Sequence, residues 1–230
     1  MSPPTKRLSS LLVGVALCLA AATVSKARST SPVQSPSVTP MSQEARDQLA
    51  PNGRLRAALN YSNFLLVSAR TPEHTGVAPD LARELARRAN ATVEFVGYEN
   101  AGLVADAAKD NAWDVAFIGA EPARAREIRF TPAYVEIEAT YLVPANSPIR
   151  TLADVDRDGV RIATTARAAY TLYLQRTLRL ATLVEADGIQ GSFDLFAASR
   201  LDVLAGLRPR LLEDAQKLPG ARADTSRKLL

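Results

Sequence analysis

The feature that most constrains the fold is an alternation of extended and helical patterns in the first half of the chain. The segments RLRAALN (54–60) and TVEFVGY (92–98) have the pattern of strands, and PDLARELARRANA (79–91) between them repeats apolar residues along one helical face. A second helical pattern, AGLVADAAKDNA (101–112), leads into the apolar run WDVAFIG (113–119). This order of strand, helix, strand, helix and strand predicts right-handed crossovers and a parallel sheet.

Two residues are expected to mark the ends of the helix predicted at 79–91. Asp80 is of the type that caps a helix start, because its carboxylate can accept a free backbone N–H. Asn90 is of the type that ends a helix in the left-handed conformation.

The alternation returns in the second half, after an extended segment. EIEATYLVPANSP (136–148) reads as extended and is ended by prolines. Strand and helical patterns then alternate, with strands expected at 160–165, 182–186 and 201–206 and helices at 169–180, 192–200 and 210–218. The sequence therefore predicts an α/β fold of two parallel-sheet lobes joined by the extended segment, with boundaries at 43–139 and 140–230.

The first 42 residues predict a secreted protein. Lys6 and Arg7 precede the apolar stretch 8–24, which is followed by small residues, and this order is typical of a signal peptide over residues 1–27. Residues 28–42 contain three prolines and many serines and threonines, so they predict a disordered leader. The folded part is expected to begin near Gln43, outside the cytoplasm.

Composition excludes several kinds of chemistry. The formal charge of +4 falls to +1 when Lys6, Arg7 and Lys26 leave with the signal peptide, so nothing indicates a nucleic-acid partner. Cys18 is the only cysteine and lies in that signal, which excludes disulfides, thiolate metal sites and a cysteine nucleophile. The single histidine, His74, stands in a turn-rich loop, and no role is expected for it. There is no G-x-S-x-G motif, and no cofactor is expected.

The residues after WDVAFIG predict a site for an anion. Ligands of open parallel sheets bind beyond the carboxyl ends of the strands, and Gly119 at such an end allows close approach to the backbone. Pro122 suits the first position of a helix, whose free N–H groups attract an anion. Arg124 can add a bidentate grip on a carboxylate. The alternative is a surface arginine paired with Glu121 or Glu127, and the spacing leaves both readings open.

Six segments in the same order resemble the periplasmic amino-acid-binding proteins of ABC transporters, the polar amino acid solute-binding family. The most specific is ARAREIRFTPAY (123–134), which has Arg124, Phe130, Pro132 and Tyr134 at the family's spacing. The others are GRLRAALN (53–60), GVAPDLARELARRANATVEFV (76–96), AWDVAFIG (112–119), TYLVPANSPIRTLADV (140–155) and ASRLDVLAG (198–206). The resemblance extends from Gly53 to about Gly220 and implies the type II periplasmic-binding fold, with a cleft between two α/β lobes.

The resemblance also implies a function and its partners. Such proteins are monomers of the periplasm that bind an amino acid or another small carboxylate and present it to an ABC permease in the inner membrane. Arg124 would grip the ligand carboxylate with help from the backbone of Gly119 to Glu121. The loop NYSNF (60–64) would line the first lobe, although it can also be an ordinary polar turn. The candidate ligand-binding residues are Asn60, Tyr61, Asn63, Gly119, Glu121, Arg124, Arg167 and Tyr170.

Three departures from the family pattern concern the site. GAEPAR (119–124) is shorter than usual and lacks a threonine contact. TARAAY (165–170) has Arg167 and Ala168 where the family has small donors; Arg167 can attract an anion, but its bulk opposes close backbone approach. Leu207 and Arg208 stand where the family has an acid for the ligand ammonium, so a standard α-amino acid would lack that partner.

The end of the chain is the largest departure. Family members continue past a segment like LPG (218–220) and return to the first lobe, whereas ARADTSRKLL (221–230) is polar and has no strand pattern. The sequence therefore predicts a disordered tail, an incomplete second lobe and no return to the first, with a truncated reading frame favoured over a reduced relative.

Two other functions stay open from the sequence. One is a periplasmic cyclohexadienyl-dehydratase-like enzyme on the same scaffold, with Glu121 or Glu73 as its general acid. The other is a remnant or sensor module that no longer binds a ligand.

Overall fold

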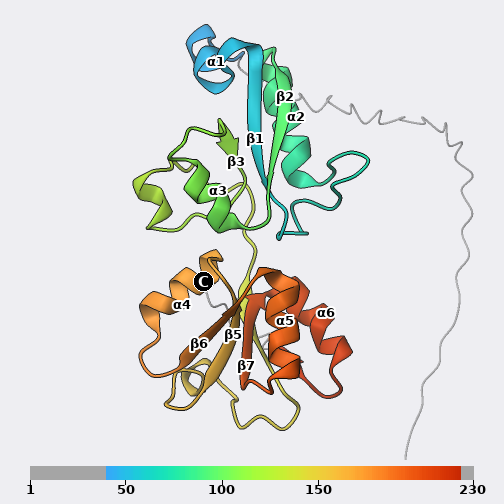
Figure 1. The fold of residues 1–230 in the computed structure, drawn as a ribbon, viewed down its shortest axis with the longest axis vertical. Coiled ribbons are helices and arrows are strands. Elements are labelled where there is room, and N and C mark those ends of the chain that lie inside the picture. Colours follow the sequence, from blue (N-terminus) through green and yellow to red (C-terminus); the bar gives the residue numbers. More distant parts are fainter. Residues whose placement is uncertain (1–39, 224–230) are drawn as a thin grey trace, which may run out of the picture. The chain divides into compact units, whose positions relative to one another are not determined.

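The computed structural model describes residues 40–223, whose strands form two separate sheets (Figure 1). The predicted signal peptide, residues 28–39 of the predicted leader and residues 224–230 of the predicted tail lie outside the described residues. No helix within residues 40–223 is both long enough and apolar enough to span a membrane.

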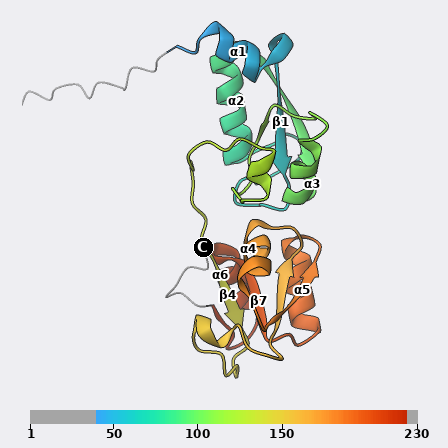
Figure 2. The same cartoon turned by 90° about the vertical axis from the view of Figure 1, so that its left-hand side faces the viewer.

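The first sheet has the strand order β2-β1-β3, and both neighbours run parallel to β1. Its strands are β1 (Arg54–Asn60), β2 (Thr92–Tyr98) and β3 (Val115–Ala116), and its helices are α1 (Gln43–Leu49), α2 (Val77–Ala89) and α3 (Ala101–Ala107). The bounds of β1 and β2 agree with the prediction. Figure 2 shows α2 and α3 on opposite sides of β1, as right-handed crossovers before and after β2 require.

The third strand is much shorter than the predicted 113–119. Asp114 takes part in its start: its N–H donates to the carbonyl of Arg56, and its carboxylate accepts the N–H of Arg56. The chain then pairs with β1 only over Val115–Ala116 before it leaves the sheet. An apolar run thus predicted the strand, but it did not predict how few of its residues find a partner.

Helix α2 packs on the first sheet through small side chains. Ala78, Ala82 and Ala86 are buried, which lets the helix lie close to the strands. The helix begins after Gly76, whose φ of 120° and close contact with Leu66 exclude a side chain. The prediction that Asp80 caps the helix is wrong, because Asp80 lies within the first turn and pairs with an arginine one turn later.

The C-terminal end of α2 follows the prediction. Asn90 has the left-handed conformation, with φ 55° and ψ 44°, and its N–H bonds to the last turn. An asparagine tolerates this region better than most residues, so it ends the helix at low conformational cost.

The second sheet has the order β6-β5-β7-β4-β8. β5 is parallel to β6 and β7, whereas β4 is antiparallel to β7 and β8. The strands are β4 (Ala139–Val143), β5 (Arg161–Thr165), β6 (Thr182–Ala186), β7 (Val203–Leu207) and β8 (Arg222–Ala223), and the helices are α4 (Ala169–Thr177), α5 (Gly188–Ala198) and α6 (Arg208–Lys217). The segment predicted as an extended connection therefore also supplies a fully buried strand of the second sheet.

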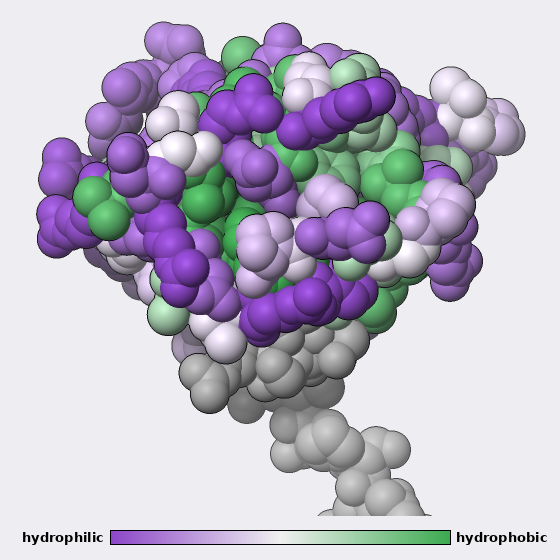
Figure 3. Space-filling view, turned by 90° about the horizontal axis from the view of Figure 1, so that it is seen from below, coloured by the Kyte–Doolittle hydropathy of each residue, from purple (hydrophilic) through white to green (hydrophobic). Residues whose placement is uncertain are grey.

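Short 3-10 turns complete the secondary structure at η1 (Pro51–Gly53), η2 (Arg124–Arg126) and η3 (Leu152–Asp154). On the face that Figure 3 shows, hydrophilic side chains surround smaller groups of apolar ones, as is usual for a surface in contact with water.

The described parts of the two segments predicted to be disordered are ordered. At the leader's end, the Ser42 hydroxyl accepts the N–H of Ala45 and caps α1. In the predicted tail, Arg222–Ala223 pair with the free edge of β4, and Arg222 Nη2 donates to the carbonyl of Ser147 at 3.1 Å. The tail prediction failed here because two residues are too few to show a strand pattern.

Candidate functional site

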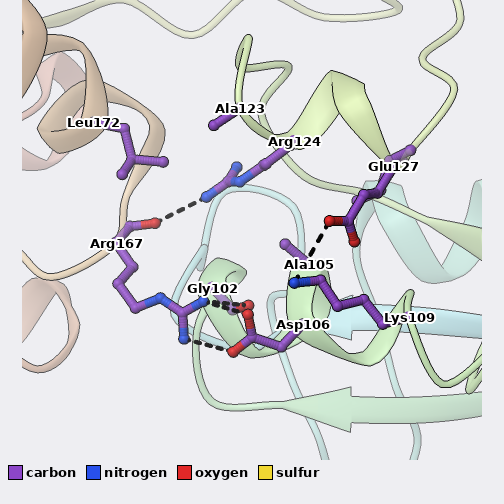
Figure 4. Close-up of a pocket in the computed structure, with 10 residues that line it drawn as sticks. Gly102, Ala105, Asp106, Lys109, Ala123, Arg124, Glu127, Arg167 and Leu172 are labelled. Carbon is purple, nitrogen blue, oxygen red and sulfur yellow. Dashed lines mark hydrogen bonds and ion pairs between the residues drawn. The ribbon is translucent and has the colours of Figure 1, made fainter.

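Arg124 lies in the turn η2, at the end of the loop that leaves β3. Only 6% of the residue is exposed. Its Nη1 donates to the carbonyl of Gly119 at 2.8 Å, and its Nη2 donates to the carbonyl of Arg167, also at 2.8 Å (Figure 4). The alternative of a surface arginine paired with Glu121 or Glu127 is therefore wrong.

The electrostatic setting of Arg124 is unfavourable to its charge. Burial, with a smaller contribution from the positive charge of Arg167, lowers the pKa of Arg124 to about 10. The guanidinium still carries its proton at neutral pH, so a cation is held against main-chain dipoles in a buried place. Such a group gains from an anion, because a carboxylate would supply the missing opposite charge.

The expected helix start at Pro122 is wrong, and with it the expected anion site on free N–H groups. The segment forms only the 3-10 turn Arg124–Arg126, which is too short to act as a helix N-terminus. Glu121, itself buried, accepts the N–H of Ala123 at 2.8 Å and forms an ion pair with Arg176 of α4. A side chain of the protein thus already occupies the N–H that a ligand would have used.

A cavity of about 210 Å³ adjoins Arg124. Three cations and two acids line it, and Figure 4 shows the other four charged side chains around Arg124. The full lining is Gly102, Ala105, Asp106, Lys109, Ala123, Arg124, Glu127, Ile128, Arg167 and Leu172. Asp106 pairs with Arg167, and Lys109 pairs with Glu127 at 3.5 Å. Among the lining cations, Arg124 is the one whose hydrogen bonds to described residues both end on carbonyl oxygens.

Arg167 connects the second sheet to α3 of the first. It follows β5 with φ 58°, and its guanidinium binds both oxygens of Asp106, at 2.8 and 2.7 Å. The same Nη2 donates to the carbonyl of Gly102 at 3.0 Å. This pairing holds the pKa of Asp106 below its usual range. The side chain of Arg167 is therefore at the predicted site, but it binds an acid of the protein itself.

The loop 60–64 does not line this cavity. Asn60 closes the turn after β1, because its Oδ1 accepts the N–H and the hydroxyl of Ser62 at 3.2 and 2.8 Å. Tyr61 stacks on His74 with ring centroids 5.8 Å apart, and its hydroxyl lies 2.7 Å from His74 Nε2. The guanidinium of Arg70 lies 4.1 Å from the Tyr61 ring centre. His74, for which no role was expected, is thus a structural partner of Tyr61.

The remaining two candidates, Asn63 and Tyr170, do not line the cavity. The side-chain carbonyl of Asn63 is buried and has no hydrogen-bond partner among the described residues. Tyr170, in the first turn of α4, is 4% exposed, and burial raises its pKa to about 12. The structure therefore brings Gly119, Arg124 and Arg167 together, and places Asn60, Tyr61, Asn63 and Tyr170 in other surroundings.

Comparison with protein families decides the classification. Residues 56–223 match the family of bacterial extracellular solute-binding proteins, family 3. The chain belongs to this family. No protein with curated annotation matches the sequence of this solute-binding protein.

Solved structures show the same fold. An ancestral amino-acid-binding protein described as a precursor of cyclohexadienyl dehydratase is 20% identical, with a TM-score of 0.65 over 78% of this chain and 80% of that one. The cysteine-binding protein from Campylobacter jejuni is 19% identical, with a TM-score of 0.64 over 78% and 73%. The arginine-bound form of truncated ArgBP from T. maritima is 18% identical, with a TM-score of 0.61 over 79% and 84%. The solute-binding protein thus has the two-lobe α/β fold of amino-acid-binding proteins.

The sequence analysis missed the part of the site that α3 and the turn after it contribute. Gly102, Asp106 and Lys109 all line the cavity of this solute-binding protein. Their spacing of three and four residues places them on one face of the helical pattern predicted at 101–112, and this is the signal that could have found them. Residues 40–223 contain no group of histidine, cysteine and acidic side chains that could hold a metal ion.

Proposed function

We propose that this protein binds an amino acid or a related small carboxylate outside the cytoplasm and delivers it to an ABC importer. The observation that carries the proposal is the buried cation Arg124, which lines a cavity. Its hydrogen bonds to described residues end on the carbonyls of Gly119 and Arg167. The family, and the amino-acid-binding proteins among the similar structures, support the ligand class. Delivery to a permease rests on the family alone.

The buried charge of Arg124 favours the binding of an anion. A buried guanidinium without a counter-ion is destabilising, and main-chain carbonyls compensate it only in part. A ligand carboxylate that replaces the Arg167 carbonyl would form a charge-assisted hydrogen bond of about 1.5–3 kcal/mol. The binding of an anion therefore relieves a cost that the ligand-free protein bears.

Thermal unfolding of residues 28–230 with a panel of amino acids and dicarboxylates tests the proposal. A ligand at about 100 times its Kd adds about 2.7 kcal/mol of stability, which shifts Tm by several degrees in a domain of this size. Arg124→Ala should abolish the shift. Arg126→Ala, which removes an exposed arginine of the same turn, should retain it and serves as the control. An Arg124→Ala variant that responds to the same ligand as the parent does would contradict the proposal.

A dehydratase activity has less support. Of the two acids considered for it, Glu121 is ion-paired with Arg176, and Glu73 is exposed; neither lines the cavity. The two acids that do line the cavity, Asp106 and Glu127, are each paired with a cation. Incubation with prephenate or arogenate decides the matter, since release of a ring-aromatised product would favour an enzyme. A protein without a cooperative transition, or without response to any carboxylate, would be a non-binding remnant.

A further inference from the structure

We propose that Arg167 is an internal occupant of the pocket, and that the ligand it stands in for carries a guanidinium group as well as a carboxylate. This inference rests on the proposed function and names its ligand class. It comes from the way in which one residue fills both ends of the site, with its main chain on Arg124 and its side chain on Asp106 (Figure 4).

At the first end, the carbonyl of Arg167 takes the place of a ligand carboxylate. It accepts the hydrogen bond from Arg124 Nη2 at 2.8 Å. The turn that presents it has φ 58° at Arg167, a conformation that is uncommon for residues other than glycine. A carboxylate oxygen in the same position would carry a negative charge where the carbonyl has only a dipole, so the ligand is the stronger partner of Arg124.

At the second end, the site has the shape and chemistry of a guanidinium receptor. Its groups are acceptors only: the two oxygens of Asp106 and the carbonyl of Gly102. A planar fork of N–H donors satisfies all three at once, which neither an aliphatic nor a hydroxyl-bearing side chain can do.

Gly102 provides the space for this flat group. A Cβ at position 102 would lie 2.4 Å from Nε and 2.5 Å from Cζ of Arg167. Gly102 stands inside α3 and has no positive φ, so the backbone does not require glycine there, and glycine lowers helix propensity. The guanidinium of Arg167 therefore lies in the space that a side chain at position 102 would take.

The internal occupant can be displaced. The side chains of Arg167 and Asp106 are 44% and 57% exposed, and ion pairs in such surroundings contribute little to stability. A free guanidinium ligand can take over Asp106 and Gly102 when the Arg167 side chain swings into solvent. In the parent protein, the apparent affinity for such a ligand equals the intrinsic affinity multiplied by the fraction of molecules in which Arg167 has left the site.

Calorimetry with L-arginine and L-citrulline tests this competition, because citrulline replaces the guanidinium by a neutral urea of the same shape. Arg167→Ala should bind arginine about three- to fivefold more tightly than the parent does, with little change for citrulline. Arg167→Lys should restore the weaker binding of arginine, since a lysine can again pair with Asp106. Arg176→Ala, which removes the ion pair between α4 and Glu121, controls for general loosening.

A second variant tests whether the tighter binding of arginine depends on the space beside Gly102. Gly102→Ala in the Arg167→Ala background should lose the arginine gain, because the methyl group fills the guanidinium position. Alanine raises helix propensity, so the loss would not come from unfolding of α3. Thermal unfolding of each variant without ligand checks this point.

Three results would overturn the inference. The first is an equal gain for arginine and citrulline in Arg167→Ala, and the second is a gain of the same size in Arg176→Ala. The third is Arg124-dependent binding of amino acids with uncharged side chains, with no preference for arginine in any variant. That result would leave the proposed function intact. If no carboxylate bound to parent or variant, the proposed function would fail together with the inference.

Discussion

The carboxylate of Asp114 holds Arg56 by its main chain and its side chain together. Oδ2 accepts the N–H of Arg56 at 2.7 Å and its Nε at 3.1 Å, and Oδ1 accepts Nη2 at 2.6 Å. Asp202 makes the same main-chain contact with Arg161, at 2.8 Å, but its ion pair is longer, at 3.8 Å. Asp114 directly precedes β3, and Asp202 directly precedes β7. The two sheets therefore share the same aspartate–arginine contact, which is buried in the first sheet and exposed in the second.

This pair of sites gives a matched prediction about stability. Asp114→Asn should lower the free energy of unfolding by about 2–3 kcal/mol, because the Asp114 side chain is 7% exposed and its charge-assisted bonds have no solvent substitute. Asp202→Asn should cost less than about 1 kcal/mol, since both side chains there are well exposed. Denaturant unfolding of the two variants measures both. Equal losses of unfolding free energy in the two variants would mean that burial does not set the strength of the aspartate–arginine contact.

A second prediction concerns Gly76, the residue before α2. Gly76→Ala should destabilise the protein by about 3 kcal/mol, because φ is 120° and the new Cβ would lie 2.5 Å from the carbonyl oxygen of Leu66. Gly159→Ala is the control: φ is 79°, but no atom lies within 4 Å of its Cβ position, so only the backbone cost of about 1 kcal/mol remains. A shift of Tm of similar size in the two variants would contradict the steric argument.

The pKa of Arg124 predicts a pH dependence of binding and stability with opposite signs. Burial lowers this pKa to about 10, so affinity for a carboxylate should fall as the pH rises through about 10 and the guanidinium loses its proton. Between that value and the ordinary arginine pKa, the unfolded chain binds more protons than the folded one, so this group makes stability rise with pH. Titration of ligand binding in parent and Arg124→Lys checks the first part. Affinity that stays constant to well above pH 10 in the parent would count against the pKa assignment.

Tyr61 tests whether loop 60–64 touches the ligand. Tyr61→Phe removes the hydrogen bond to His74 and should cost about 1 kcal/mol of stability while leaving ligand affinity unchanged, because Tyr61 does not line the cavity. Tyr134→Phe, at a half-exposed tyrosine, is the control for loss of a hydroxyl. A large loss of affinity in Tyr61→Phe would restore this loop to the binding site.

The sequence predicted elements well where the pattern is local. The bounds 54–60, 92–98 and 182–186 of β1, β2 and β6 agree with the prediction to the residue. The short strands β3 and β8 were not predicted in their extent, because two paired residues carry no periodicity. That β4 joins β7 and β8 depends on partners far along the chain, which a local pattern cannot reveal.

In the site, too, the sequence predicted the local contact and missed the long-range one. Gly119 and Arg124, five residues apart, were expected together and are hydrogen-bonded. The contact of Arg167 with Asp106 and Gly102 joins segments more than 60 residues apart, so spacing gave no sign of it. The ion pair with Asp106 also explains why the protein tolerates the bulky cation Arg167 at a position where small donors were expected.

The place of β4 between β7 and β8 bears on how the chain is made. All five residues of β4 are buried in the folded protein, and both of their partner strands come later in the sequence. During synthesis, residues 139–143 therefore leave the ribosome before any strand that can pair with them exists. Until β7 arrives, this segment has open backbone groups and apolar side chains without partners, which are the features that favour aggregation and chaperone binding in unfinished chains.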